Sequence, residues 1–82
     1  MLKIKVKKLL SYRGYYGNIQ YSPEDKILFG KVVGLPSNIL ISYEGNSLAE
    51  LEQDFRGCID LYIESCKEYG EKPKKSNLND YN

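Results

Sequence analysis

The carboxylates are the residues of this chain with the most chemical potential, because converging acids can hold the two divalent metals of a nuclease site. They are scattered over a turn-like segment, a strand end and a helix-like segment: Glu24, Asp25, Glu44, Glu50, Glu52, Asp54, Asp60 and Glu64. At helical spacing Glu50 shares a face with Asp54, and Asp60 shares one with Glu64. No acid stands at the centre of a strand-like run to meet them. We therefore expect no catalytic metal site and interpret these acids as a solvated helix face.

Histidine is absent, which removes the usual general base near neutral pH and the commonest metal ligand. The two cysteines, Cys58 and Cys66, are about 12 Å apart if they lie on one helix, which is too far for a disulfide. Only Lys67 stands near them to lower a thiol pKa, so we interpret both as core residues. Reduced thiols are typical of a cytosolic protein. The sequence predicts a protein without enzymatic activity, cofactor or metal.

Contact with nucleic acid is a second chemistry to weigh. Four lysines near the N-terminus, together with Arg13 and the tyrosines, offer phosphate contacts and base stacking: Lys3, Lys5, Lys7 and Lys8. A net charge of +1 provides no global field for nucleic acid or for an anionic membrane. An edge strand whose lysines discourage pairing with another chain explains the same pattern. RNA binding is therefore an alternative with weak support.

Binding to another protein fits the charge pattern best. Between Ser47 and Tyr69 there are six acids and two basic residues, whereas the strand region and the N-terminal arm are positive. An acidic surface favours a basic partner and speeds the encounter with it; ordinary solvation of a helix is the competing interpretation. Four residues near the ends of the expected strands are the candidate partner contacts: Tyr16, Asp25, Tyr43 and Glu44.

A long helix is expected to begin after Ser47, because Ser47 and Glu50 form a capping box in which each side chain bonds the other's backbone N–H. Apolar residues then recur at steps of mostly three and four: Leu48, Leu51, Phe55, Cys58, Ile59, Tyr62, Ile63, Cys66 and Tyr69. Gly70 fits the position after the helix end, and Pro73 prevents a restart. Gly57, in mid-helix, indicates close contact with a strand, with Gly30 as the candidate neighbour.

Three strand-like runs precede this helix, at residues 12–21, 27–33 and 39–43, with turns at 22–26 and 34–38. Gly14 and Gly17 indicate a bulge or a close backbone approach in the first run. The fold class is therefore α+β: a three-stranded antiparallel β-meander with one long helix packed on one face, in the order β-β-β-α. Residues 2–6 alternate between apolar residues and lysine, which is typical of an extra N-terminal edge strand or of a frayed arm.

The chain divides into a basic N-terminal arm or edge strand at 1–11, a folded domain at 12–73 and a polar, disordered tail at 74–82. It has no long apolar run and no secretory signal, so we expect a cytoplasmic protein with no membrane contact. The second strand is apolar on both faces, with Ile27 and Phe29 on one and Leu28 on the other. Since one helix covers only one face, we expect the other face to be buried in a homodimer or tetramer.

Several segments in order resemble HicB-like antitoxins. Residues 12–22 (YRGYYGNIQYS) are similar to the family's first strand, 29–35 (FGKVVGL) to its second, 41–51 (ISYEGNSLAEL) to its strand-to-helix junction, and 60–66 (DLYIESC) with 71–73 (EKP) to its helix end. Together they span about residues 12–75, most of the chain. Each piece is weak alone, and the ordered set with its short spacings is fairly specific.

The resemblance implies a partial ribonuclease-H-like fold, with a last strand in some members, and the role of antitoxin in a type II toxin-antitoxin pair. Such domains bind HicA, a small RNA-cleaving toxin with a double-stranded-RNA-binding-like fold, and mask its active site. Many members add a C-terminal DNA-binding segment that represses their own operon. Only nine residues follow Pro73, so we expect no direct DNA binding by this chain. The alternatives are a stand-alone oligomeric RNA-binding module and, with least support, a degenerate nuclease.

Overall fold

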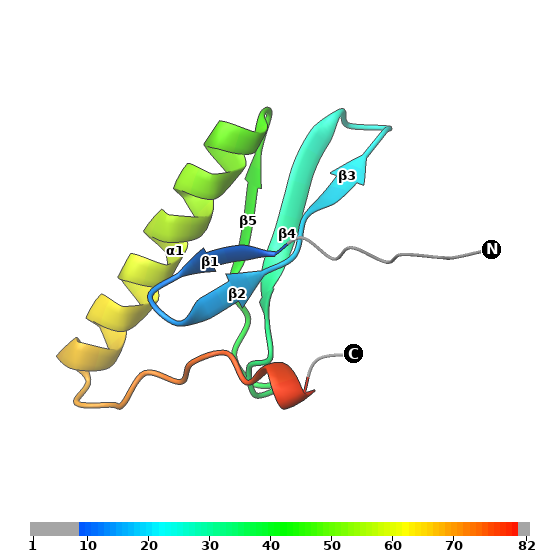
Figure 1. The fold of residues 1–82 in the computed structure, drawn as a ribbon. Coiled ribbons are helices and arrows are strands. Elements are labelled where there is room, and N and C mark those ends of the chain that lie inside the picture. Colours follow the sequence, from blue (N-terminus) through cyan, green and yellow to red (C-terminus); the bar gives the residue numbers. More distant parts are fainter. Residues whose placement is uncertain (1–8, 81–82) are drawn as a thin grey trace.

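Strand β4, Ile27–Val33, is the centre of the sheet in the computed structural model, which describes residues 9–80 (Figure 1). Strand β5, Ser42–Gly45, pairs antiparallel with one edge of β4. Two short strands share the opposite edge of β4: β3, Gln20–Ser22, pairs with its first half, and β2, Tyr15–Gly17, pairs with its last residues. Strand β1, Leu10–Tyr12, pairs with β2. All pairs are antiparallel and one helix packs on the sheet, so the predicted α+β fold class is confirmed.

The first predicted strand, at residues 12–21, differs from the structure because it contains a turn. Arg13 and Gly14 both have positive φ, at 52° and 85°, and connect β1 to β2 as a two-residue hairpin loop. Such loops need left-handed backbone at both positions, which glycine adopts without strain. An extra edge strand thus precedes the meander, but it lies at Leu10–Tyr12. The alternating residues 2–6 lie outside the described residues.

A break at Asn18 separates β2 from β3 and keeps both strands on β4. The Asn18 N–H donates to the Lys31 carbonyl oxygen at 3.1 Å, and the Lys31 N–H donates to Asn18 Oδ1 at 2.9 Å. Gly30 is required beside this break, because a Cβ there would collide with the Asn18 carbonyl oxygen. Gly30 therefore contacts Asn18, and the predicted contact between Gly30 and Gly57 is wrong.

The third predicted strand, at residues 39–43, is shifted toward the helix. The Ile39 N–H donates to the Pro36 carbonyl oxygen at 3.0 Å in a turn, which leaves residues 39 and 40 outside the strand. Pairing with β4 begins where the Ile41 carbonyl accepts from the Val32 N–H at 2.9 Å. The strand then continues to Gly45, where a Cβ would collide with the backbone of Leu51. This glycine lets the helix begin directly against the sheet.

Helix α1, Leu48–Glu68, begins and ends where the sequence predicts. Ser47 Oγ accepts from the Glu50 N–H at 3.2 Å, whereas Glu50 Oε1 accepts from the N–H of Asn46, one residue before the cap, at 3.0 Å. At the other end, Gly70 has a φ of 68° and its N–H donates to the Lys67 carbonyl. The Glu71 N–H reaches the Cys66 carbonyl at 2.7 Å, so the last carbonyls are satisfied in the manner of a Schellman motif.

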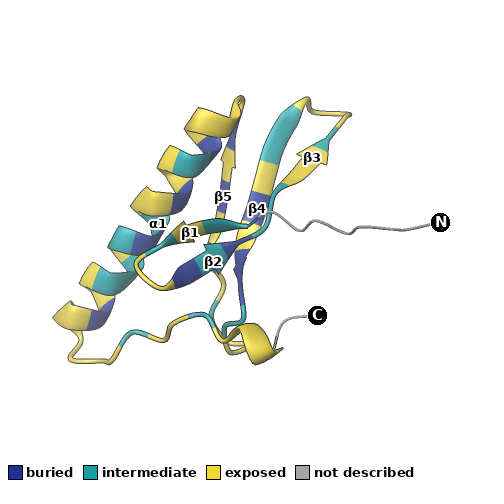
Figure 2. Ribbon diagram, viewed as in Figure 1, coloured by how far each residue is buried: buried dark blue, intermediate teal, exposed yellow. Residues whose placement is uncertain are grey.

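The apolar stripe of α1 packs on one face of β4 and β5, and Figure 2 shows buried residues along α1, β4 and β5. Leu51, Phe55 and Ile59 are completely buried there. Their neighbours in the core come from β2, β4, β5 and the residue before β5: Tyr15, Val32, Tyr43 and Ile41. The rings of Tyr43 and Phe55 meet edge-on, with centroids 5.0 Å apart, an arrangement that favours aromatic pairs.

Gly57 lies on the outer side of α1, where a Cβ would meet nothing within 4 Å. The interpretation of Gly57 as a point of close contact with a strand is therefore wrong. The close approach to the helix occurs instead at Gly17 of β2, where a Cβ would collide with the Tyr43 hydroxyl and lie 2.8 Å from Phe55 Cε1. The smallest residue is thus needed on the strand side of this contact.

The second face of the sheet is mixed in character. Pairing places Phe29 opposite Glu44 and Lys31 opposite Ser42, so apolar and polar side chains alternate on this face. Phe29 is 36% exposed, and Ile27 is half-buried. This face therefore lacks the continuous apolar surface on which the prediction of a sheet-to-sheet oligomer rested.

Residues 71–80 turn back beneath the sheet (Figure 1), which differs from the disordered tail predicted for 74–82. The Lys74 N–H donates to the Tyr62 hydroxyl, the Tyr16 N–H donates to Ser76 Oγ at 3.0 Å, and the Asn77 N–H donates to the Gly34 carbonyl at 2.8 Å. A short 3-10 helix, Leu78–Asp80, follows. Polar composition did not prevent order here, because backbone amides and one serine supply the contacts. Residues 81 and 82 lie outside the described part.

Candidate partner-binding groove

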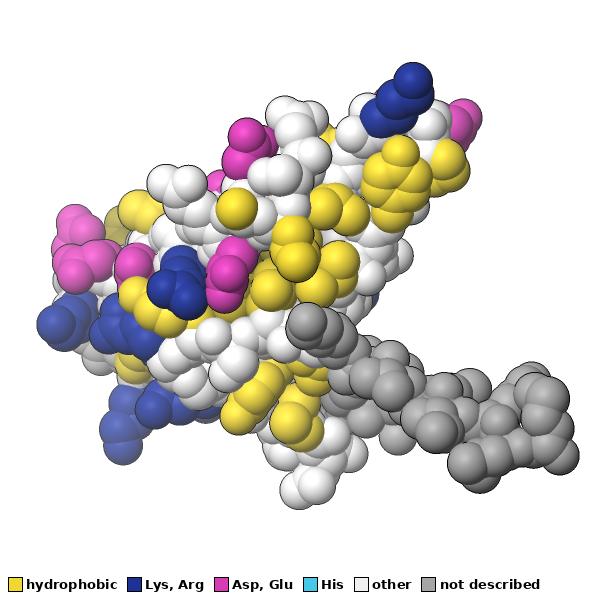
Figure 3. Space-filling view, turned by 45° about the horizontal axis from the view of Figure 1, so that its top comes forward, with side chains coloured by type: hydrophobic (Ala, Val, Ile, Leu, Met, Phe, Trp, Pro, Cys, Tyr) yellow, Lys and Arg dark blue, Asp and Glu magenta, His cyan; other side chains and the backbone are white. Residues whose placement is uncertain are grey.

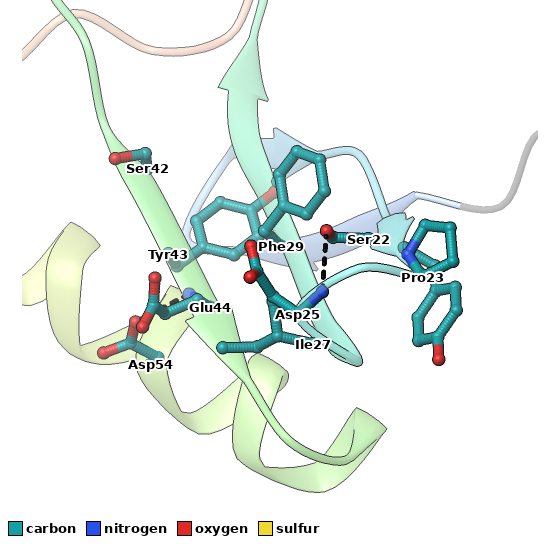
Figure 4. A pocket seen from close by; sticks show the side chains of 11 residues that line it. Ser22, Pro23, Asp25, Ile27, Phe29, Ser42, Tyr43, Glu44 and Asp54 are labelled. Atoms are coloured by element: carbon teal, nitrogen blue, oxygen red, sulfur yellow. Dashed lines mark hydrogen bonds between the residues drawn. The ribbon is translucent and has the colours of Figure 1, made fainter.

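An open groove of about 910 Å³ lies between the β3–β4 hairpin, β5 and the first half of α1 (Figure 4). We call it the acidic groove. Its lining residues are Tyr21, Ser22, Pro23, Asp25, Ile27, Phe29, Gly30, Ser42, Tyr43, Glu44 and Asp54. Three of the four contact candidates predicted from the sequence are among them: Asp25, Tyr43 and Glu44. The groove is the place where the chain brings predicted site residues together.

The floor and one side of the acidic groove are apolar. Phe29 projects from β4 into it, Ile27 lies beside Phe29, and Pro23 stands on the hairpin side (Figure 4). Tyr21 of β3 is 57% exposed, which is high for an aromatic residue in a strand. Figure 3 shows hydrophobic side chains gathered beside this hairpin. Exposed aromatic and aliphatic side chains of this kind are typical of the centre of a protein interface.

All charged side chains that line the groove are acidic: Asp25, Glu44 and Asp54. Glu44 and Asp54 stand together on one side, and Asp25 lies on the hairpin between them and Pro23 (Figure 4). Asp25 is held at the turn by its own N–H, which donates to Ser22 Oγ at 3.4 Å. Three like charges around an apolar floor produce a negative potential that attracts a basic protein surface.

Asp54 has a second role at the edge of β5. Its Oδ2 accepts from the backbone N–H of Glu44 at 2.9 Å, which joins α1 to the outer edge of the strand. Nearby, the Cys58 thiol donates to the Ser42 carbonyl oxygen at a sulfur-to-oxygen distance of 3.4 Å. Burial, and then the charge of Asp54, raise the pKa of the Cys58 thiol. A raised pKa leaves this thiol protonated, as a donor must be, and lowers its reactivity.

Tyr43 lines the groove but belongs to the core, since only 4% of it is exposed. Its hydroxyl lies 2.9 Å from the Asn18 carbonyl oxygen and 3.1 Å from that of Lys31, and it donates its proton between them. Burial raises its pKa well above the usual tyrosine range. The interpretation of Tyr43 as a partner contact is corrected by this burial: the residue positions β4 and the strand break.

Tyr16 lies away from the acidic groove. It is half-buried on β2, and its N–H is bonded to Ser76 of the returning C-terminal segment. The structure thus leaves Asp25 and Glu44 as exposed groove residues and places Tyr16 elsewhere. Sequence reasoning did not select Tyr21, Phe29 and Asp54. The apolar residues on both faces of the strand runs were a signal for the first two, whereas Asp54 was one acid among several on the helix.

A separate cluster fastens the β1–β2 hairpin to α1. Asp60 accepts from Arg13 Nη1 at 2.8 Å and from the Tyr12 hydroxyl at 2.9 Å, and the Arg56 guanidinium lies 5.3 Å from the centroid of the Tyr12 ring. The hydrogen bond from Arg13, and then the one from Tyr12, hold the pKa of Asp60 below its ordinary value. All members of this cluster have hydrogen-bond or ring partners within the chain, so it is structural.

The described residues offer little support for the other chemistries that the sequence raises, namely metal binding, membrane insertion, thiol chemistry and nucleic-acid contact. Among residues 9–80, no group of three or more His, Cys, Asp or Glu is placed to hold a metal ion. Over the same range, no helix combines the length and apolar character of a membrane span. Cys66 is buried and Cys58 half-buried, and both are free thiols. The lysines of the N-terminal arm, at residues 3, 5, 7 and 8, lie outside the described part.

Comparisons with known proteins do not identify the chain: no protein-family model, no curated protein and no solved structure matches it.

Proposed function

We propose that this chain is a HicB-like antitoxin without catalytic activity of its own. In this role it binds a small, basic, HicA-like toxin that cleaves RNA, and covers the toxin's active site. The observation that carries the proposal is the acidic groove, which combines an apolar floor with three carboxylates and has no basic residue in its lining. A protein that binds RNA presents basic side chains, so this groove complements it in charge.

Two further features support the proposal. The antiparallel sheet followed by one long helix agrees with the β-β-β-α layout that the sequence resemblance implies. The groove also has the character of an interface, because Phe29 and Tyr21 provide apolar area while Asp25 and Glu44 stand exposed on its sides. Aromatic anchors supply affinity, and surrounding charges supply rate and selectivity.

The proposal is tested by co-expressing the chain with the product of the neighbouring open reading frame, followed by affinity pull-down and a growth assay. We expect a stoichiometric complex, and growth that depends on this chain. Asp25→Lys and Glu44→Lys reverse charges in the groove and should each weaken binding by about tenfold, more at low salt than at high salt. Glu68→Lys is the control, because Glu68 is an exposed acid in the last turn of α1, away from the groove.

Three results would reject masking through this groove: a neighbouring product that is not toxic and does not co-purify, binding unchanged by either reversal, or equal weakening by Glu68→Lys. A salt-sensitive mobility shift of labelled RNA by the purified chain alone would favour the RNA-binding alternative instead.

A further inference from the structure

Strand β3 forms an edge of the sheet, since within residues 9–80 it pairs only with β4. The Asn18 N–H donates to the Lys31 carbonyl oxygen of β4, and backbone groups of alternate residues point the same way along a strand. Gln20 therefore also faces β4, whereas the N–H and C=O groups of Ile19 and Tyr21 point away from it. Proteins cover such an edge or protect it with charge.

Strand β1 is aligned with this edge. Leu10 stands opposite Gly17, so β1 begins beside the break that separates β2 from β3 (Figure 1). The break inserts no residue, because Gly17 pairs with Val32 and Gln20 pairs with Phe29 in one continuous register against β4. A chain that continues β1 backward in its own register therefore runs along the edge of β3.

The sequence before β1 has the alternation that this edge requires, because lysines and apolar residues alternate over residues 3–7. Eight residues precede the described part, which is enough to reach the end of β3. Opposite residues of an antiparallel pair project from the same face of the sheet. Continuing the register of β1 gives three such pairs: Lys7 with Gln20, Val6 with Tyr21, and Lys5 with Ser22.

This register directs two lysines to the acidic groove. Gln20 stands opposite Phe29, and Phe29 stands opposite Glu44, so these three side chains share the second face of the sheet. Phe29 and Glu44 line the acidic groove, whose lining holds three acids and no basic residue. The ion pairs of the described residues join Arg13 to Asp60 and Arg56 to Glu52, and neither uses a groove acid.

The apolar residue of the arm reaches the opposite face. Tyr21 is 57% exposed and stands opposite Leu28, which packs against the core. Val6 would lie beside Tyr21, and cross-strand pairs of an aromatic and a β-branched residue stabilise sheets. A slip of one residue would bring the lysines to Tyr21 and the valine to the acids, so the pattern selects one register.

We propose that residues 5–8 continue β1 along the edge of β3 and hold Lys5 and Lys7 over the acidic groove. In this arrangement the backbone groups of Tyr21 bond those of Val6, and Ile19 bonds Lys8. The pairing goes beyond the proposed function and does not depend on it. Its consequence rests on that function: a basic partner must displace these lysines to enter the groove.

The test is a pair of engineered cysteines in the full chain. Lys7→Cys with Gln20→Cys places two thiols at directly opposite positions, about 4.5 Å apart between Cα atoms, which a disulfide can bridge. Val6→Cys with Gln20→Cys is the matched control, because its thiols point to opposite faces. Under mild oxidation the first pair should join within one chain at least about tenfold faster than the second. Peptide mass spectrometry distinguishes this bond from any that involves Cys58 or Cys66.

Amide hydrogen exchange gives a second readout that needs no cysteine. The Tyr21 N–H should exchange at least about tenfold more slowly in wild type than in Val6→Pro, because proline cannot donate to the Tyr21 carbonyl. Gly17 is the internal control, since its partner in β1 is unchanged. Equal joining of the two cysteine pairs, bonds between chains in place of bonds within one chain, or an unprotected Tyr21 N–H would overturn the proposal.

Binding to the neighbouring gene product tests the consequence separately. The chain locked by a disulfide between positions 7 and 20 should bind that product about tenfold more weakly than the same chain after reduction. Equal binding would reject competition by the arm, even where the pairing holds. No binding by either form would reject the proposed function, whereas the cysteine and exchange results would still decide whether the arm pairs with β3.

Discussion

At the scale of single residues, two buried tyrosines have opposite hydrogen-bonding states. The Tyr43 hydroxyl bonds backbone carbonyls on both sides of the strand break, at Asn18 and Lys31. The Tyr15 ring is completely buried beside Tyr62, and its hydroxyl has no hydrogen-bond partner among the described residues. A buried hydroxyl stabilises a fold only when it is bonded, so these two residues contribute differently although both are core aromatics.

Replacing each of these tyrosines by phenylalanine isolates its hydroxyl group. Tyr43→Phe removes the hydroxyl that donates to the Asn18 and Lys31 carbonyl oxygens, of which only the Lys31 oxygen keeps a backbone donor among the described residues, the Asn18 N–H. It should lower the free energy of unfolding by about 1–2 kcal/mol. Tyr15→Phe removes an unbonded polar atom and should leave stability unchanged or raise it by a few tenths of a kcal/mol. Urea denaturation measures both. Equal destabilisation by the two changes would contradict this account, because it would show that the bonded and the unbonded hydroxyl contribute alike.

The bonded Asp60 carboxylate makes stability depend on pH. Hydrogen bonds from Arg13 and Tyr12 lower its pKa in the folded state, so the ionised form contributes stability above the unfolded value of about 3.9. This contribution is lost as the pH falls through the lowered folded pKa. Asp60→Asn should therefore be less stable than wild type at pH 7, and the difference should narrow on acidification. Urea midpoints between about pH 7 and pH 3 measure this narrowing, with the exposed Glu64→Gln as control.

At the scale of the elements, glycine is required at some positions of this chain and not at others. At Gly14 it supplies left-handed backbone in a hairpin, at Gly17 it permits contact with Tyr43 and Phe55, and at Gly57 it has no neighbour that requires it. Helix α1 therefore has an avoidable weak point in its outer face, because glycine loses more backbone entropy than alanine on folding.

Substituting alanine at Gly57 and at Gly17 should have effects of opposite sign. Gly57→Ala adds a methyl group into open space and should raise the free energy of unfolding by about 0.5–1 kcal/mol. Gly17→Ala forces a methyl group into the Tyr43 hydroxyl and should lower it by about 1–3 kcal/mol. In a domain of this size, 1 kcal/mol moves the melting temperature by about 4–8 °C, so thermal unfolding resolves both. A destabilised Gly57→Ala would mean that this helix face is packed.

The elements also show what the sequence can predict. The helix was predicted at both ends, because Ser47 and Gly70 act through local backbone geometry that residue types reveal. The hairpin at Arg13 was missed, because arginine is uncommon in left-handed backbone and the tyrosines around it favour a continuous strand. No groove is predicted from the sequence. Asp25 and Glu44 are candidate contacts because they stand near strand ends, whereas the contribution of Asp54 to the groove depends on how α1 lies along β5.

At the scale of the whole molecule, the C-terminal segment fastens distant parts of the fold together. It bonds Tyr62 of α1, Tyr16 of β2 and Gly34 after β4 through three hydrogen bonds. Asn77 also fits tightly against Gly34, where a Cβ would lie 2.6 Å from the Asn77 carbonyl oxygen. Local composition could not predict this order, because its cause is the complementary backbone of other elements.

Shortening the chain measures what this segment contributes. A chain that ends at Glu71 loses all three hydrogen bonds. Its free energy of unfolding should be about 1–2 kcal/mol lower than that of the full chain, because the bonds are partly offset by the entropy that the full chain loses in ordering this segment. A chain that ends at Asp80 keeps the bonds and should match the full protein. Urea denaturation of the three chains makes the comparison, and equal midpoints would show that the segment docks without stabilising the domain.

The bonded groups on the outer edge of β5 affect how readily the protein aggregates at high concentration. Exposed strand edges act as templates on which identical chains stack into fibrils. Here the Asp54 carboxylate occupies the outward Glu44 amide and the Cys58 thiol occupies the outward Ser42 carbonyl, so another chain cannot use these two groups while they are bonded. The same two side chains that bind helix to sheet therefore protect the protein from templated aggregation, and solutions of it should stay clear at concentrations where an open strand edge would seed fibres.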